Sequence, residues 1–198
     1  CQHGHEFLRP IEVELSGAGC RYCSTSKSSQ TETEISFELG QFDESWDPFD
    51  TKAEGVENKL LDNVDIKLFN GRVNIEYDPA WVHGEREDRQ DGDQRKSNAL
   101  LMAKPPPKAV YRIREDDRHG NLLPLIHGVT TIRVRNRATV KEIADAVIKQ
   151  LISDGFLELT PEVGAYLASD SPNRSGEARA WFAKHRIVDS SKEGGANS

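Results

Sequence analysis

Residues 65–77 read DIKLFNGRVNIEY, and they predict a β-hairpin. Apolar and polar side chains alternate over residues 72–77, as they do in a strand with one buried face. The Asn-Gly pair at 70–71 is a strong turn signal, because both residues tolerate the positive φ angles that tight hairpin turns need. The middle of the chain is therefore expected to be rich in β-structure.

Three other stretches also have the pattern of strands. Residues 33–39 (TEISFEL) alternate apolar and polar side chains and predict a half-buried strand, and residues 109–114 (AVYRIR) are a second candidate. Residues 130–135 (TTIRVR) alternate cleanly, which turns Ile132 and Val134 inward and the two arginines outward. These strands and the hairpin indicate a sheet assembled from several short elements.

A helix follows the last of these strands. Thr139 and Glu142 have the spacing of a capping box, and apolar residues then recur at helical spacing as far as Ile152. Gly155 stands where a helix usually ends, and residues 156–159 (FLEL) predict another strand. A winged-helix unit is one interpretation, but the unbroken helix favours a strand–helix–strand unit.

Together these patterns predict an α+β fold in four segments. A small zinc-binding module at residues 1–30 precedes an acidic, hairpin-rich middle at 31–104. Three prolines at 105–107 form a rigid stretch that opens a strand–helix–strand module at 105–188. A disordered tail is expected at 189–198.

Charge is distributed unevenly along the 198 residues. Residues 1–100 carry 11 basic and 21 acidic side chains, whereas residues 101–198 carry 15 and 12. Residues 84–98 are highly charged and lack periodic apolar residues, so they predict an exposed loop. The net charge of −7 argues against non-specific nucleic-acid binding by the whole surface, but not against a local basic site.

Five arginines define such a local site. They fall on or beside two predicted strands, and if these strands pair, the outward guanidinium groups form one basic face that suits phosphate backbones or RNA. The residues are Arg112, Arg114, Arg133, Arg135 and Arg137. An alternative stays open, in which these arginines solvate the sheet or pair with the acidic first half.

The first 23 residues, CQHGHEFLRPIEVELSGAGCRYC, contain all three cysteines and two histidines. A CxxC pair can place both thiolates on one tetrahedral zinc ion. If residues 1–5 are extended, Cys1, His3 and His5 all turn their side chains to the same side. The predicted ligands of a structural zinc ion are Cys20 and Cys23 with two of Cys1, His3 and His5. A redox-active CxxC, a disulfide, a lipid-modified Cys1 and unliganded cysteines are the alternatives.

The zinc site is expected to be structural, because cysteine-rich ligand sets usually close the coordination sphere. A catalytic zinc ion with Glu6 as the acid/base group is the less favoured alternative. With its two cysteine clusters and the glycines between them, the segment 1–23 resembles the short zinc heads that precede catalytic domains in bacterial toxin and defence proteins. That resemblance covers no other part of the chain and implies no catalytic residue.

The sequence favours a binding protein over an enzyme. No nucleophile-elbow, P-loop, dinucleotide or HExxH motif occurs, and Asp116–His119 indicates a charged turn rather than a hydrolytic cluster. No signal peptide and no run of about 20 apolar residues is visible, so a cytoplasmic protein without a membrane segment is expected. The hypothesis is an accessory or adaptor subunit with protein partners and a possible nucleic-acid contact, and the alternative is a metal-dependent or nucleic-acid-acting hydrolase or a toxin-type effector.

Overall fold

The computed structural model describes residues 30–80, 87–117, 119–121, 123–170, 174 and 176–182. The chain divides into two compact units, of which the larger is Ile35–Asn173 and the smaller combines Cys1–Glu34 with Arg174–Ser198. In the smaller unit, residues 176–182 are helical, and Trp181 and Phe182 meet edge to face at 5.3 Å. The predicted zinc-binding module, apart from its last residue, and the predicted tail lie outside the described residues.

The larger unit contains one four-stranded sheet in the order β1-β2-β3-β4. Its strands are β1 (Ile66–Leu68), β2 (Val73–Asp78), β3 (Ala109–Glu115) and β4 (Thr130–Val134). β1 and β2 form the predicted antiparallel hairpin, whereas β2–β3 and β3–β4 are parallel pairs. The mixed α and β content predicted from the sequence is confirmed.

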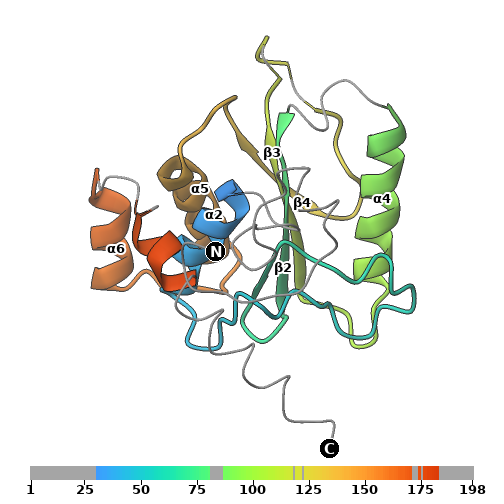
Figure 1. Cartoon of the computed structure of the whole chain (residues 1–198), viewed down its shortest axis with the longest axis horizontal. Helices are drawn as coiled ribbons and strands as arrows, with labels where there is room; N and C mark the ends of the chain where they lie inside the picture. Colours follow the sequence, from blue (N-terminus) through green and yellow to red (C-terminus); the bar gives the residue numbers. More distant parts are fainter. Residues whose placement is uncertain are drawn as a thin grey trace, which may run out of the picture. The chain divides into compact units, whose positions relative to one another are not determined.

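Helices cover both faces of this sheet. Besides the helical residues 176–182, the described helices are α2 (Gln30–Gly40), α4 (Glu87–Leu101), α5 (Val140–Ser153) and α6 (Pro161–Ala168). Figure 1 shows α4 on one side of the strands and α5 on the other. The predicted capping box is present at the start of α5, where Thr139 and Glu142 satisfy each other's backbone N–H groups.

The apolar core lies on the α5 side of the sheet. Every second strand residue points to this side and packs against the inner face of α5. The strands contribute Val73, Ile75, Ile113 and Ile132, and α5 contributes Ile143 and Val147. On the opposite side, a smaller apolar cluster around Leu100 and Val110 covers only one end of the sheet. The rest of that face is polar, which decides where the candidate sites lie.

Two segments have a different secondary structure from the one predicted. Residues 33–39 belong to helix α2 and not to a strand, and residues 33–40 are buried on every side, so their alternation does not mark one exposed face. Residues 87–98 of the predicted exposed loop at 84–98 form most of α4, and residues 84–86 lie outside the described part.

The predicted module boundary at 104/105 falls inside one sheet. β2 and β3, which lie on opposite sides of that boundary, pair over six residues from Val73↔Ala109 to Asp78↔Arg114. Residues 156–159 do not form the predicted strand, so the predicted strand–helix–strand module is in fact β4, α5 and then α6. Within the described residues, no helix combines the length and the apolar character that crossing a membrane requires.

Candidate functional site

Two of the five arginines predicted for a basic face are buried. Arg112 and Arg114 are 1% and 2% exposed, because their side of the sheet is covered by α4. The alternation of β3 correctly turned them away from the apolar core, but it could not show that a helix covers the other face. The accessible part of the predicted strip is therefore limited to Arg133, Arg135 and Arg137.

The buried arginines form an ionic network with two aspartates. Arg112 donates Nε to Asp78 Oδ2 at 2.7 Å and Nη2 to Asp78 Oδ1 at 2.6 Å, and its Nη1 reaches Ser97 Oγ at 3.0 Å. Arg114 lies 3.3 Å from the same Asp78 carboxylate and 3.5 Å from Asp93. Burial lowers the pKa of Arg112, but the hydrogen bonds to Asp78 and the negative charges of Asp78, Asp93 and Glu76 together raise that pKa by more, so the guanidinium stays charged. The network joins β2 and β3 to α4.

A second buried carboxylate lies beside this network. Glu76 on β2 is 3% exposed, and its Oε2 accepts a hydrogen bond from Lys96 of α4. Its Oε1 has no hydrogen-bond partner among the described residues. Burial, with the neighbouring Asp65 as a second cause, raises the pKa of Glu76 to about 8 against the opposing effect of Lys96.

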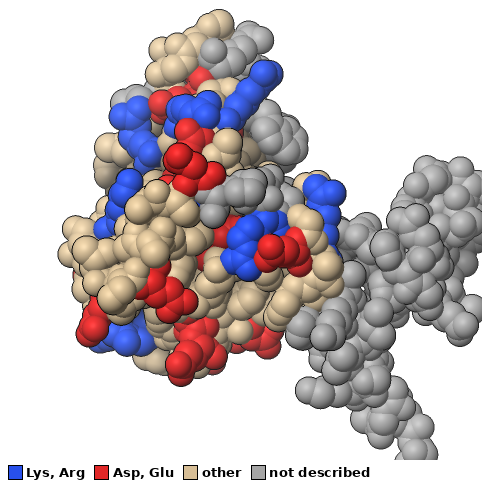
Figure 2. Space-filling model, turned by 90° about the vertical axis from the view of Figure 1, so that its left-hand side faces the viewer, with Lys and Arg blue, Asp and Glu red and all other residues tan. Residues whose placement is uncertain are grey.

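The exposed arginines are already engaged in surface ion pairs. Arg133, 48% exposed, lies 2.9 Å from Asp116, and Arg135, 61% exposed, lies 2.8 Å from Glu142. Figure 2 shows that basic and acidic side chains are interspersed on the face it presents and do not form a patch of one sign. Such a surface attracts a polyanion less strongly than a continuous basic strip would.

The Asp116–His119 segment is a turn stabilised by its own carboxylate. Asp117 Oδ1 accepts hydrogen bonds from the backbone N–H groups of His119 and Asn121, each at 2.7 Å. The hydrogen bonds from Asn121 lower the pKa of Asp117 below its usual value. Among the described residues of this segment, the geometry is that of a charged turn, as predicted, and Arg118 lies outside the described residues.

An open cleft lies on the hairpin side of the same unit. We call it the hairpin cleft: it is lined by the turn between β1 and β2, by residues 45–54 and by residues 105–108. It has two adjoining parts, with volumes of about 280 Å³ and about 90 Å³, that share Glu54, Lys67, Asn70 and Gly71 as lining residues.

Asn74 is the distinctive residue of the larger part. It lies on β2 opposite Lys67 of β1, and the residue is 3% exposed. Its carbonyl oxygen Oδ1 has no hydrogen-bond partner among the described residues, although Asn74 lines the cleft. An unpaired buried amide oxygen costs roughly 1–3 kcal/mol. Because Oδ1 itself is shielded from solvent, a ligand can donate a hydrogen bond to it only when the Asn74 side chain turns toward the cleft.

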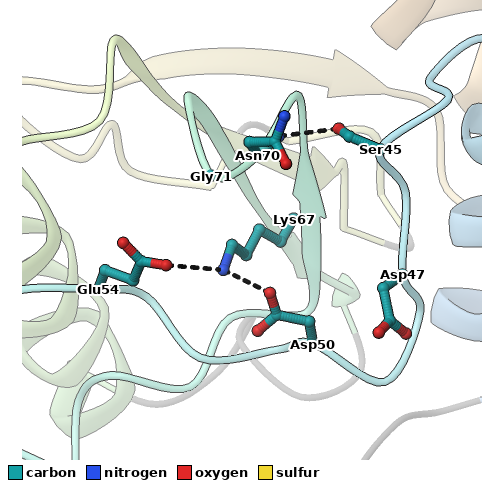
Figure 3. A pocket seen from close by; sticks show the side chains of 7 residues that line it. All are labelled: Ser45, Asp47, Asp50, Glu54, Lys67, Asn70 and Gly71. Atoms are coloured by element: carbon teal, nitrogen blue, oxygen red, sulfur yellow. Dashed lines mark hydrogen bonds and ion pairs between the residues drawn. The ribbon is translucent and has the colours of Figure 1, made fainter.

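Lys67 separates the two parts of the cleft. Figure 3 shows its side chain extending from β1 between Asp50 and Glu54. Its ammonium group lies 2.6 Å from Asp50 and 3.9 Å from Glu54, and it also donates to the carbonyl oxygen of Lys52 at 3.2 Å. The side chain of Lys67 is almost fully buried, and these contacts hold its ammonium group in place.

Two glycines allow the walls of the cleft to approach closely. Gly71, at φ +77°, packs over Lys67, and a Cβ atom there would lie 2.9 Å from Lys67 Cε. Gly55, at φ +70°, packs on the backbone of Lys104, where a Cβ atom would lie 2.1 Å from the carbonyl oxygen. The glycines therefore bring the hairpin turn and the loop before β1 against their neighbours.

The amino-acid sequence alone does not reveal the cleft. Asn74 and Lys67 occupy ordinary polar positions of the predicted hairpin, and of the lining only the turn residues Asn70 and Gly71 and the prolines at 105–107 stand out in the sequence. The cleft brings together residues that are up to 63 positions apart, from Ser45 to Lys108, so no local spacing could have marked it.

The predicted zinc ligands cannot be placed. Cys1, His3, His5, Cys20 and Cys23 all lie outside the described residues. In the part of the chain that is described, no group of three or more His, Cys, Asp or Glu side chains is arranged to hold a metal ion.

Comparison with known proteins leaves the function to be argued from the site itself. No protein-family model matches the sequence, and no significant match was found among curated proteins or among solved structures.

Proposed function

We propose that the chain is an accessory or adaptor subunit that binds a partner through the hairpin cleft. The observation that carries this proposal is Asn74, whose buried carbonyl oxygen has no partner among the described residues and which lines an open cleft. Buried polar groups are nearly always paired in native proteins, so an exception at a cleft indicates a bond that a ligand completes.

The state of the other polar groups supports binding over hydrolysis. The carboxylate of Asp117 is occupied by the N–H groups of its own turn, and that of Asp78 by two buried guanidinium groups. Neither is free to act on a substrate in this arrangement. The cleft, in contrast, combines open space with charged groups of both signs that a partner can pair with.

In this proposal the N-terminal module binds structural zinc, and the protein is cytoplasmic. Cys20 and Cys23 supply two ligands, and two of Cys1, His3 and His5 supply the others. The spacing of the cysteines supports this assignment, and free thiolate ligands are maintained in a reducing compartment such as the cytoplasm.

The zinc assignment predicts about one zinc ion per chain. Elemental analysis of the purified wild-type chain beside the Cys20→Ser/Cys23→Ser variant is the test, and the variant should contain no zinc, since a tetrahedral site does not survive the loss of two thiolates. A metal-free wild type, or a variant that retains its zinc, would rule out this ligand set.

A nucleic-acid contact is a second part of the proposal. Arg133, Arg135 and Arg137 supply the accessible guanidinium groups, at the end of β4 and in the residues before α5. Their exposure supports the contact. Because Arg133 and Arg135 already have carboxylate partners, the expected contact is weak and decreases with salt.

The partner-binding function predicts site-specific cross-linking in cells that produce the protein. A photo-reactive phenylalanine analogue in place of Lys108, an exposed cleft residue, should cross-link a partner protein. The same analogue in place of Arg135 tests for cross-linked nucleic acid. The readout is the mass shift of the chain on a denaturing gel, before and after nuclease treatment.

Two controls make the experiment specific for the cleft. The analogue in place of Leu125, which is 67% exposed and does not line the cleft, should yield no such product. Adding Asn74→Ala to the Lys108 variant should remove the partner band. A band that persists with Asn74→Ala, or that forms equally from Leu125, would refute binding through the cleft.

A further inference from the structure

The two parts of the hairpin cleft differ in charge. The smaller part is lined by three carboxylates, those of Asp47, Asp50 and Glu54, against the single ammonium group of Lys67. Since Asp50 is paired with Lys67 at 2.6 Å, the carboxylates of Asp47 and Glu54 give this part its net negative charge. With a volume of about 90 Å³, it has room for the end of one basic side chain.

The larger part has the opposite balance. Because Lys67 is already paired with Asp50, the positive charge of this part comes from Arg72 and Lys108, which line it against the single carboxylate of Glu54. Residues 105–107 form an apolar wall of three prolines beside these charges. A ligand that spans both parts therefore meets negative charge at one end, positive charge at the other and a rigid apolar surface near the positive end.

The amide of Asn74 indicates what lies between the two ends. A primary amide carries one acceptor oxygen and a donor NH₂ group, so it can pair with both the N–H and the C=O of a peptide group. The volume of about 280 Å³ falls just below the roughly 300–1,000 Å³ of pockets that enclose whole small-molecule ligands. It suits one or two residues of an extended chain.

We propose that the hairpin cleft binds a peptide segment of the partner protein in which a basic residue lies a few positions from an acidic one. This inference rests on the proposed partner-binding function and specifies its ligand. The basic side chain enters the part lined by Asp47 and Glu54, the acidic side chain meets Lys108, and Asn74 pairs with the peptide backbone between them.

A peptide titration of the full-length, ¹⁵N-labelled chain tests this assignment. The probes are N-acetylated, C-amidated octapeptides with one lysine and one glutamate separated by one to four alanines, in both orders. The Gly71 backbone amide and the Asn74 side-chain amide report on the cleft. At least one peptide should shift both signals saturably, and replacing either charged residue of that peptide by alanine should weaken binding roughly tenfold.

Matched variants show whether the cleft is the site. Asn74→Ala should weaken binding roughly tenfold, as loss of one hydrogen bond to a buried amide implies. Asn121→Ala, which changes an exposed asparagine outside the cleft, should leave the affinity unchanged. The dispersion of the remaining amide signals shows that each variant is folded.

Three outcomes would overturn the inference. The first is that no signal shifts at millimolar peptide, and the second is that wild type and Asn74→Ala bind with equal affinity. The third is that acetate or methylammonium alone produces equal shifts, which would make the cleft a site for small ions. If these peptides fail while the Lys108 cross-link forms and depends on Asn74, partner binding stands and the mixed-charge segment is rejected.

Discussion

Replacing Asp78 by alanine should lower the free energy of unfolding by about 3–5 kcal/mol. The carboxylate of Asp78 is buried and accepts two hydrogen bonds from Arg112, while Arg114 lies 3.3 Å away. Its removal leaves two guanidinium groups in the interior with Asp93 as the remaining carboxylate of the network. Uncompensated charge of this kind is among the most destabilising changes a core can undergo.

Urea unfolding followed by circular dichroism measures this effect, and Asp116→Ala is the matched control. Asp116 also pairs with an arginine, at 2.9 Å, but Arg133 is half exposed to water. The control should therefore lose about 1 kcal/mol or less. If both variants lose a similar amount of unfolding free energy, Arg112 and Arg114 do not depend on Asp78 for their stabilisation. In that case the ionic network is not what joins α4 to the sheet.

The elements that the sequence predicted correctly are those with one face on the apolar core. In the hairpin, β3, β4 and α5, residues such as Ile75, Ile113, Ile132 and Val147 recur with the period of the element. The period therefore identifies both the type of element and its buried face. The cap at Thr139 and the turn at Asn70-Gly71 were identifiable because they depend on local backbone bonds.

The elements that were missed are those whose burial does not follow this rule. Helix α4 carries few apolar residues, because its inner face contacts the polar side of the sheet through Asp93, Lys96 and Ser97. A pattern of apolar residues cannot reveal a helix that is buried by polar contacts. Helix α2 was missed for a different reason, since residues 33–40 are buried on all sides and show no helical period.

The same reasoning explains the arginines and the cleft. The alternation of side chains along β3 places Arg112 and Arg114 on the face of the sheet that Ile113 does not share. Only the connection from β2 through α4 to β3 determines that a helix covers this face. The role of Asn74 depends on the approach of residues 105–108 to the hairpin, which follows from the parallel pairing of β2 and β3. Such long-range pairing leaves no mark in local sequence spacing.

Glu76 makes the stability of the fold depend on pH. Burial raises its pKa to about 8, whereas in the unfolded chain the pKa is near its ordinary value of 4.5. Between these two values the folded protein keeps a proton that the unfolded chain has released, so stability is highest below the unfolded pKa and is lost as the pH rises through the folded pKa. Each pH unit in this window contributes about 1.4 kcal/mol, so wild type should lose up to about 4 kcal/mol between about pH 5 and about pH 8.

Glu76→Gln should remove most of this dependence. Glutamine keeps the shape of protonated glutamic acid and cannot ionise, so the variant should match wild type near pH 5 and exceed it in stability near pH 8. The measurement is urea unfolding of both proteins across this range. The opposing contribution is the hydrogen bond from Lys96 to Glu76, which favours the ionised carboxylate. If the variant instead becomes less stable than wild type as the pH rises, Glu76 is ionised in the folded protein, and its pairing with Lys96 outweighs the cost of burying the charge.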